Sequence, residues 1–286
     1  MYDGVVQGIA DIGLSNLGYT FGRFKETELL DLPLGFPNAW VANKVAADFY
    51  EEYQPAEFDE TVVLTLHTSP VNNIITIDRA VERLEDMQGL ELRGTGYIAQ
   101  FVEALGATAR PIAMPEAYDN LSRNVIQGLM IPYETVVTFN FGEVTHHITE
   151  VWPLGQVYTF YLVMNRDTWN SLPSEIQNII TDYVENEFRD KLTNMWNEVD
   201  ITGYEYAVDA GYEFHRLSDQ ELARWQAVAD QVIEEYIAGM VAEGHSEDEL
   251  RARIDFVRGR IAYWTEQQRA EGVKSSTGPD DLRVSP

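Results

Sequence analysis

The sequence has 286 residues, of which 45% are hydrophobic and 12% aromatic, enough apolar material for a buried core in one or two domains. Its 47 acidic residues against 20 basic ones give a formal net charge of −27, and a field of that sign repels nucleic acid and anionic membranes. Cysteine is absent, which excludes thiol nucleophiles, cysteine-ligated zinc and disulfide bonds.

Strand-like runs alternate with helical patterns over the first 165 residues, and this alternation favours an α/β fold with mostly parallel sheets. Asn38 is a candidate N-cap for a helix that ends before Pro55. The expected strands are 10–14, 61–67, 89–93, 109–114, 128–131 and 156–164, and two further expected helices are 98–105 and 116–124.

A long helix is predicted from Ser174, because apolar residues recur at helical spacing without a breaker until Gly203. At about 1.5 Å per residue such a helix is about 40 Å long, more than one small domain needs. We therefore expect it to cross between two lobes. Two more helices follow, each opened by a capping-box pattern: Ser218 with Glu221, and Ser246 with Glu249.

The sequence shows no segment of the kind that enters a membrane. No run approaches the roughly 20 apolar residues that span a bilayer. The N-terminus lacks the basic and apolar regions of a signal peptide. The polar tail from Ser275 to Pro286 is predicted to be disordered.

A glycine-rich turn follows one expected strand. Residues 94–99 (GTGYIA) fit the pattern G-x-G-x-x-A between a strand and a helix, and Glu116 lies where an acidic residue would bind a ribose. This is the pattern of a dinucleotide-binding turn. Against it, Arg93 directly precedes the turn and Pro111 interrupts the next strand, so an ordinary strand-to-helix turn is the alternative.

Arg93 is a second candidate, at the end of a strand and beside the N-terminus of a helix. Its guanidinium can hold a carboxylate with two parallel hydrogen bonds, and the free amides of the helix add a partial positive charge. A salt bridge to one of the many acidic residues is the alternative, and the sequence does not decide between them.

The histidines and serines give little support for catalysis. His146 and His147 are adjacent in a β-like stretch, so their side chains point to opposite faces and do not chelate one metal. His215 is expected near a helix end, where it carries no signal. No serine lies in a G-x-S-x-G elbow. A metal-dependent hydrolase that uses Glu134 with the two adjacent histidines stays open as an alternative.

Several weak motifs, in order and spacing, resemble the solute-binding proteins of TRAP transporters, the tripartite ATP-independent periplasmic family. The resemblance extends over about residues 5–240. The segments that carry it are 8–13 (GIADIG), 19–24 (YTFGRF), 30–34 (LDLPL), 84–93 (LEDMQGLELR), 103–107 (EALGA), 115–121 (PEAYDNL), 162–165 (LVMN) and 169–173 (WNSLP).

The resemblance implies a two-lobed α/β fold like that of periplasmic binding proteins, with the long helix bridging the lobes. The expected division is 1–70 plus 159–198 for lobe I, 71–158 plus 199–272 for lobe II, and a disordered tail 273–286. It also implies a signal peptide, a strand and a helix before the segment that begins at Gly8, so this sequence is expected to be truncated at its N-terminus.

In that family the arginine of the matching G-L-x-x-R segment binds the carboxylate of the ligand, so the resemblance assigns this role to Arg93. Met114 stands where an aromatic residue is frequent, and Ile131 stands where asparagine is frequent. These departures favour a pocket that is more apolar than a sugar acid needs, and the scarcity of basic residues favours a monocarboxylic acid with an apolar body. The other positions that the resemblance places at the ligand are Tyr19, His67, Asn73, Met114, Ile131, Glu134, Tyr158 and Phe160.

The resemblance thus implies a periplasmic, monomeric protein that captures a small organic acid between its lobes and delivers it to the membrane permease subunits. No catalytic residue, cofactor or metal is expected. An NAD-dependent oxidoreductase that uses residues 94–99 is the alternative function.

Overall fold

The computed structural model describes residues 1–284 and has a mixed α/β architecture. Its strands are β1 (Ile12–Asn16), β2 (Thr61–Thr68), β3 (Asn73–Thr76), β4 (Glu91–Arg93), β5 (Thr108–Arg110), β6 (Gly128–Ile131), β7 (His147–Glu150), β8 (Thr159–Asn165) and β9 (Glu213–Arg216). Its α-helices are α1 (Tyr2–Val6), α2 (Ala39–Tyr53), α3 (Gly96–Ala104), α4 (Met114–Ser122), α5 (Thr135–Thr138), α6 (Arg166–Ser171), α7 (Ser174–Tyr183), α8 (Arg189–Asp209), α9 (Asp219–Ala242) and α10 (Glu247–Glu271).

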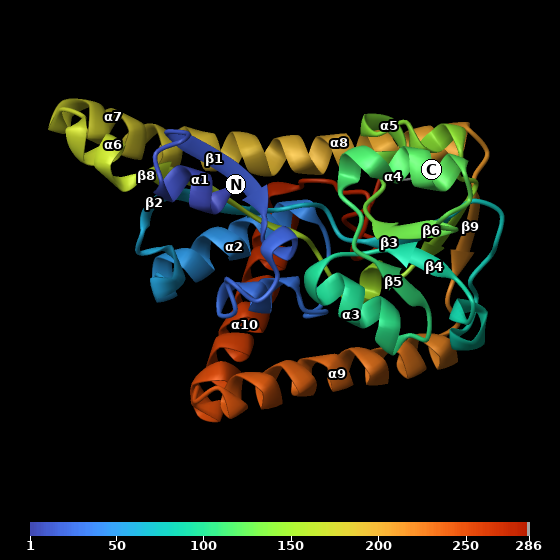
Figure 1. The fold of residues 1–286 in the computed structure, drawn as a ribbon. Coiled ribbons are helices and arrows are strands. Elements are labelled where there is room, and N and C mark those ends of the chain that lie inside the picture. The colour runs from blue at the N-terminus through green and yellow to red at the C-terminus, as the bar shows by residue number, and fades with distance from the viewer. Residues whose placement is uncertain (285–286) are drawn as a thin grey trace.

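The strands form two sheets that lie side by side (Figure 1). The first has three strands in the order β1-β8-β2, and the second has six in the order β5-β4-β6-β3-β7-β9. Strand β8 is antiparallel to both of its neighbours, and β3 is antiparallel to β6 and β7, whereas β4 pairs in parallel with β5 and β6, and β7 with β9. The expectation of mostly parallel sheets is therefore wrong, because β3 and β8 each reverse the strand direction in the middle of a sheet.

Most expected elements form near their predicted positions. The Asn38 side chain accepts a hydrogen bond from the amide of Val41 and so caps α2, as predicted. Ser218 and Ser246 cap α9 and α10 in the same way. The expected strand 109–114 is wrong: β5 ends before Pro111, and Met114 begins helix α4, in which proline occupies a first-turn position that needs no amide donor.

The long helical segment crosses from one sheet to the other. Helix α7 continues through a π-helical turn (Val184–Phe188) into α8, and Figure 1 shows the segment running past both sheets. Helix α8 packs against α2 and β2 on one side and against α5 on the other. The helix continues past Gly203 to Asp209, and Gly203 allows the backbone of Tyr133 to pack closely: a Cβ there would lie 2.4 Å from the Tyr133 carbonyl oxygen.

The last two helices return the chain from the second sheet to the first. Helix α9 packs against α3, and α10 packs against α2. Asp48 of α2 accepts hydrogen bonds from Arg260 at 2.5 Å and from Trp264 at 2.6 Å, both on α10. Helix α10, which the expected division assigns to lobe II, therefore packs on α2, which itself packs on strand β2 of the first sheet. The boundaries of the lobes stay a proposal.

The tail is packed rather than disordered, so that prediction is wrong for residues 273–284. Ser275 and Thr277 are fully buried, and Ser275 forms a β-bridge with Arg283. The Thr277 hydroxyl donates to the Pro37 carbonyl at 2.7 Å, and Asn197 of α8 donates to the Lys274 carbonyl at 2.7 Å. These hydrogen bonds offset the low hydrophobicity of the segment. Residues 285–286 lie outside the described part of the chain.

Within residues 1–284, no helix is both long and apolar enough to cross a membrane. The longest helices, α9 and α10, alternate buried apolar residues with charged ones.

Candidate ligand-binding site

A cavity of about 340 Å³ lies between the two sheets and is lined mainly by apolar side chains. This volume is within the range of small-molecule sites. The first sheet contributes Leu14, Asn16, His67 and Phe160, and the second contributes Arg93 and Ile131. The remaining lining residues are Tyr19, Ser69, Met114, Pro132, Glu134, Thr135, Phe139, Tyr158, Leu192, Met195 and Trp196.

Arg93 is the one cationic side chain among the described residues of the cavity lining. It lies at the end of β4 and is only 2% exposed. Its Nε donates to the Ile112 carbonyl at 2.9 Å, and its Nη1 donates to the Tyr158 hydroxyl at 2.9 Å. Within residues 1–284 it has no ion-pair partner, and these hydrogen bonds leave Nη2 free. The guanidinium is therefore held in place but not neutralised, as an anion site requires.

Tyr158 holds Arg93 from the segment that precedes β8. The Tyr158 hydroxyl accepts from Arg93 and donates to the Met130 carbonyl at 2.9 Å. The guanidinium carbon lies 5.1 Å from the centre of the Tyr158 ring. Burial raises the pKa of Tyr158 to about 12, so its hydroxyl stays protonated at neutral pH. Tyr158 thus fixes the direction of the guanidinium through a hydrogen bond and a cation–π contact.

Three stacked rings form an aromatic wall of the cavity: His67, Phe160 and Trp196. The His67 and Phe160 rings lie 5.0 Å apart at an angle of 5°, in register across β2 and β8, and His67 and Trp196 lie 6.1 Å apart at 26°. These three rings give this side of the cavity an aromatic, largely apolar surface.

His67 also supplies a polar group to the aromatic wall. Trp196 Nε1 donates to His67 Nδ1 at 3.1 Å, which assigns the proton of the neutral ring to Nε2. Burial lowers the pKa of His67 to about 3, so the ring is neutral at pH 7. Nε2 is buried and has no partner within residues 1–284. It is a buried hydrogen-bond donor without an acceptor, and the oxygen of a bound molecule that reached it would satisfy it.

Glu134 adds a carboxyl group at the start of α5 and is 5% exposed. The hydroxyl of Thr138 donates to it, and burial raises its pKa to about 7. Asp200 of α8 lies beside it and accepts from the amide of Glu134 at 3.0 Å, and burial also raises the pKa of Asp200 to about 7. Glu134 therefore carries a proton in much of the population at neutral pH, and a protonated carboxyl can donate a hydrogen bond to a ligand.

Because several carboxyl groups have raised pKa values, we expect the folded chain to become less stable as the pH rises from about 5 to about 8. Burial raises the pKa values of Glu28, Glu57, Glu134 and Asp200 to about 7. The unfolded chain releases the same protons near pH 4, so their contribution is complete below that pH and is lost as the pH passes 7. Thermal unfolding followed by circular dichroism at pH 5, 6, 7 and 8 should give a steadily falling Tm.

The isosteric change Asp200→Asn separates this effect from general charge repulsion. The amide oxygen keeps the hydrogen bond from Glu134, while the titrating group is removed. We expect the fall in Tm between pH 5 and pH 8 to become shallower in this variant. A Tm that rises over this pH range would contradict the assignment.

All the predicted site residues except Asn73 line the cavity. Asn73 is fully buried and accepts hydrogen bonds from the amides of Val151 and Trp152, at 3.1 and 3.2 Å, so it stabilises the end of β7. Tyr19 accepts a long hydrogen bond, 3.4 Å, from the Met114 amide and so bridges the first turn after β1 to α4. Whether these residues bind ligand stays a prediction.

Sequence reasoning missed the contribution of α8 to the cavity: Leu192, Met195 and Trp196. Their spacing follows one face of a helix, which is equally the pattern of residues that face a core. Only the position of the helix between the two sheets shows that these residues line a cavity rather than face a core.

The structure forms neither of the two alternative sites, the dinucleotide-binding turn and the metal site of Glu134 with His146 and His147. The turn Leu17–Thr20 packs on the glycine-rich turn before α3, where a Cβ at Gly18 would lie 3.2 Å from the amide nitrogen of Gly96, so the space that a pyrophosphate would need is filled. Glu134 lies in the cavity, whose described lining includes neither His146 nor His147. His215 lies on β9 beside His147, shortly before the N-cap of α9.

Two sheets that share a cavity, with one long helix crossing both, define a two-lobed binding protein of the periplasmic type, as the solved relatives are. The chain belongs to the bacterial extracellular solute-binding proteins, family 7, whose family model matches residues 1–239. Proteins of this kind serve TRAP transporters: they bind small organic acids and work with membrane permease subunits.

Two solved structures illustrate the likeness. A TRAP solute-binding protein from Rhodoferax ferrireducens, crystallised with copurified benzoate, is 25% identical and has a TM-score of 0.84, with 93% of this chain and 83% of that chain covered. A TRAP periplasmic solute-binding protein from Desulfovibrio salexigens, in an open complex, is 31% identical with a TM-score of 0.76, covering 90% of this chain and 79% of that one.

Among curated proteins, the C4-dicarboxylate-binding periplasmic protein of Rhodobacter capsulatus is 27% identical over 163 residues, which are 56% of this chain and 48% of that protein. The aligned part of the chain spans about half the length of the curated relatives it matches.

Proposed function

We propose that this chain is the periplasmic binding component of a TRAP transporter and that its ligand is a small aromatic monocarboxylate. The cavity would hold the acid between the lobes, and the closed form would deliver it to the membrane permease subunits. The protein would act by binding alone, without a chemical step. The observation that carries the proposal is the buried, unpaired guanidinium of Arg93 facing an apolar cavity with an aromatic wall.

The number of charges in the cavity favours a single carboxylate. Arg93 is the one cation in the described lining, while Glu134 is acidic. A second ligand carboxylate would be buried without a partner, which costs several kcal/mol. The charge count therefore argues against a dicarboxylate, the ligand in the name of the Rhodobacter capsulatus relative.

The lining favours an aromatic body for the ligand. The wall of His67, Phe160 and Trp196 offers an aromatic surface against which a ring can pack, and Leu14, Met114 and Ile131 add apolar surface. The hydroxyl groups of a sugar acid would find few partners on such a surface. His67 Nε2 and the carboxyl of Glu134 could each bind one polar substituent of an aromatic ring. The Rhodoferax ferrireducens relative, with copurified benzoate, supports this assignment.

Closure of the lobes would couple binding to delivery. The Tyr19 hydroxyl, on the side of the first sheet, accepts from the Met114 amide of α4, and both residues line the cavity, so this contact joins its two sides. A ligand that contacts Arg93 on one side and Phe160 on the other would favour the closed form by its differential affinity for that form. Exclusion of water on closure would strengthen the contact between the guanidinium and the carboxylate.

Calorimetric titration of protein refolded from denaturant, which removes copurified ligand, tests the proposal. Benzoate should bind, and succinate and D-glucuronate should bind at least about 100-fold more weakly, because each leaves polar groups without partners. Cyclohexanecarboxylate is the matched control, since it keeps the carboxylate and similar bulk but has no aromatic face. It should bind more weakly than benzoate. Tighter binding of succinate or glucuronate than of benzoate would refute the assigned ligand class.

A further inference from the structure

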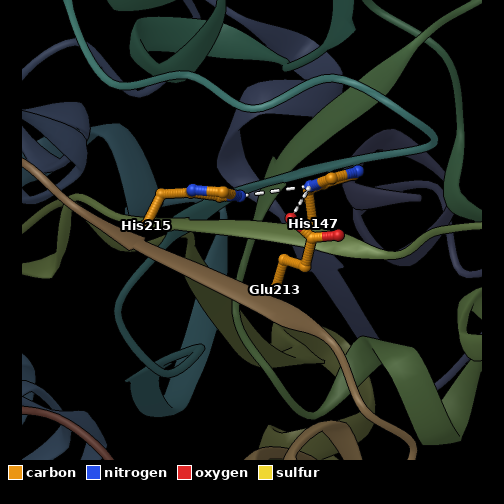
Figure 2. Close-up of side chains that lie close together, drawn as sticks. All are labelled: His147, Glu213 and His215. Carbon is orange, nitrogen blue, oxygen red and sulfur yellow. Dashed lines mark hydrogen bonds and ion pairs between the residues drawn. The ribbon is translucent and has the colours of Figure 1, made fainter.

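A second polar cluster lies on the six-stranded sheet, away from the cavity: His147 of β7 with Glu213 and His215 of β9. His147 is in register with Glu213 across the parallel pair, and His215 lies two residues further along β9, on the same face. Figure 2 shows the three side chains converging from the two strands. None of the three is among the cavity-lining residues.

The distances in the cluster suit a small tetrahedral cation. His147 Nδ1 lies 3.1 Å from His215 Nε2 and 3.7 Å from a carboxylate oxygen of Glu213. Ligands of a tetrahedral zinc ion with metal–nitrogen distances of about 2.0–2.1 Å are separated by about 3.3 Å. Two imidazoles and one carboxylate are also ligands that zinc accepts. The cluster therefore has suitable ligand types, and two of its three separations are close to the edge of such a tetrahedron, while all its ligand atoms lie within 4.8 Å of one another.

A fourth residue orients one of the ligands. Glu82, in the loop that follows β3, places a carboxylate oxygen 3.5 Å from His215 Nδ1. A carboxylate on that side favours the tautomer that carries its proton on Nδ1 and leaves the lone pair of Nε2 directed at His147. Metal-binding histidines commonly have such a partner on their second nitrogen. Both histidine side chains are largely buried, at 16% and 12% exposure, so their positions are constrained by packing.

We propose that His147, Glu213 and His215 bind one divalent cation of the zinc type, with water as the fourth ligand and Glu82 as the orienting residue. Strand β9 is the edge strand of its sheet and is held there by β7. A cation bound by both strands would cross-link residues that are 68 positions apart in the sequence. It would therefore stabilise the pairing of the edge strand β9 with β7. The net charge of −27 favours the approach of cations to the protein. The site does not depend on the ligand proposed for the cavity.

The test is a zinc titration of the whole chain after dialysis against a chelator. We expect one equivalent of zinc to bind with micromolar or tighter affinity and to raise the Tm, and cobalt to give the visible absorption of a tetrahedral complex. Glu213→Gln should weaken zinc binding at least about ten-fold. Its side chain is 69% exposed, so this variant does not threaten the fold. His215→Gln should abolish the cobalt spectrum.

His146→Gln is the matched control, because His146 is adjacent in the sequence but contacts Tyr212 on the other side of the chain. It should bind zinc like the unmodified chain. If zinc does not bind the unmodified chain, the two histidines form only a hydrogen bond between their rings and the proposal is wrong. Zinc binding that survives both Glu213→Gln and His215→Gln would also overturn it, since the metal would then lie elsewhere.

Discussion

Arg93→Ala is expected to lower the affinity for benzoate by roughly 2–5 kcal/mol, which is about 30-fold to several thousand-fold. The guanidinium is 2% exposed and has no acidic partner within residues 1–284, so the ligand carboxylate would supply its missing counter-charge. Without Arg93, the same carboxylate would enter a largely apolar cavity with no cation to meet it. Calorimetric titration of the ligand-free variant measures this loss.

Arg110→Ala is the matched control. Arg110 is in register with Arg93 on the neighbouring strand β5, but it is exposed and forms a bidentate pair with Glu91, at 2.8 and 2.9 Å. Its loss removes one positive charge from the same region of the molecule without touching the cavity, so affinity should stay within about two-fold. Arg93→Lys should be intermediate, because an ammonium keeps the charge but not the paired donors. Unchanged affinity in Arg93→Ala, with an unchanged circular dichroism spectrum, would refute the role of Arg93.

The position of Arg93 could be predicted from local sequence because its surroundings are local. A strand end, a glycine-rich turn and a helix start follow one another within a dozen residues, and the structure forms them as β4 and α3. That the guanidinium is free of an internal acid could not be predicted, since 47 acidic residues were available to pair with it. Its partner is instead Tyr158, 65 positions away, which reaches it through the packing of the two sheets.

Features that depend on distant pairing were missed. Strand β9 contains a single apolar residue, Phe214, and has no strand signal of its own; its register with β7 defines it. The same pairing places His215 beside His147. The sequence shows only that His147 is adjacent to His146, and this gives no sign of a contact with His215. The prediction of a disordered tail is wrong for a related reason. Its serines and threonines are typical of disorder, but Ser276 donates a hydrogen bond to the buried Asp200.

Gly155→Ala is expected to destabilise the folded chain strongly. Gly155 has a φ of +62°, and a Cβ there would lie 2.0 Å from the backbone nitrogen of Phe36 and 2.2 Å from the carbonyl carbon of Gly35. Neither atom can move aside easily, because the two segments are joined by backbone hydrogen bonds from Gly35 to Leu154 at 3.2 Å and from Phe36 to Gly155 at 3.3 Å. The methyl group would therefore separate them.

Gly211→Ala isolates the contribution of the backbone angle alone. Gly211 has a φ of +79°, but a Cβ there would meet nothing within 4 Å. Its replacement should cost about 1–2 kcal/mol, the penalty of a left-handed conformation for alanine. Gly155→Ala should carry that penalty and a steric one, for a loss of at least about 4 kcal/mol in the free energy of unfolding.

Denaturant unfolding of both variants, followed by circular dichroism, measures the difference. If Gly155→Ala is recovered only unfolded while Gly211→Ala folds, this also shows that the steric clash at Gly155 costs more than the backbone angle alone. The consequence extends to the cavity, because Gly155 begins the segment that leads to Tyr158, whose amide donates to Ser69 at 3.0 Å and whose hydroxyl holds Arg93. If the variant folds, its benzoate affinity should fall as well, since Tyr158 would be displaced. Equal losses of stability in the two variants would mean that Gly155 and Gly35 do not approach as closely in solution as their backbone hydrogen bonds require.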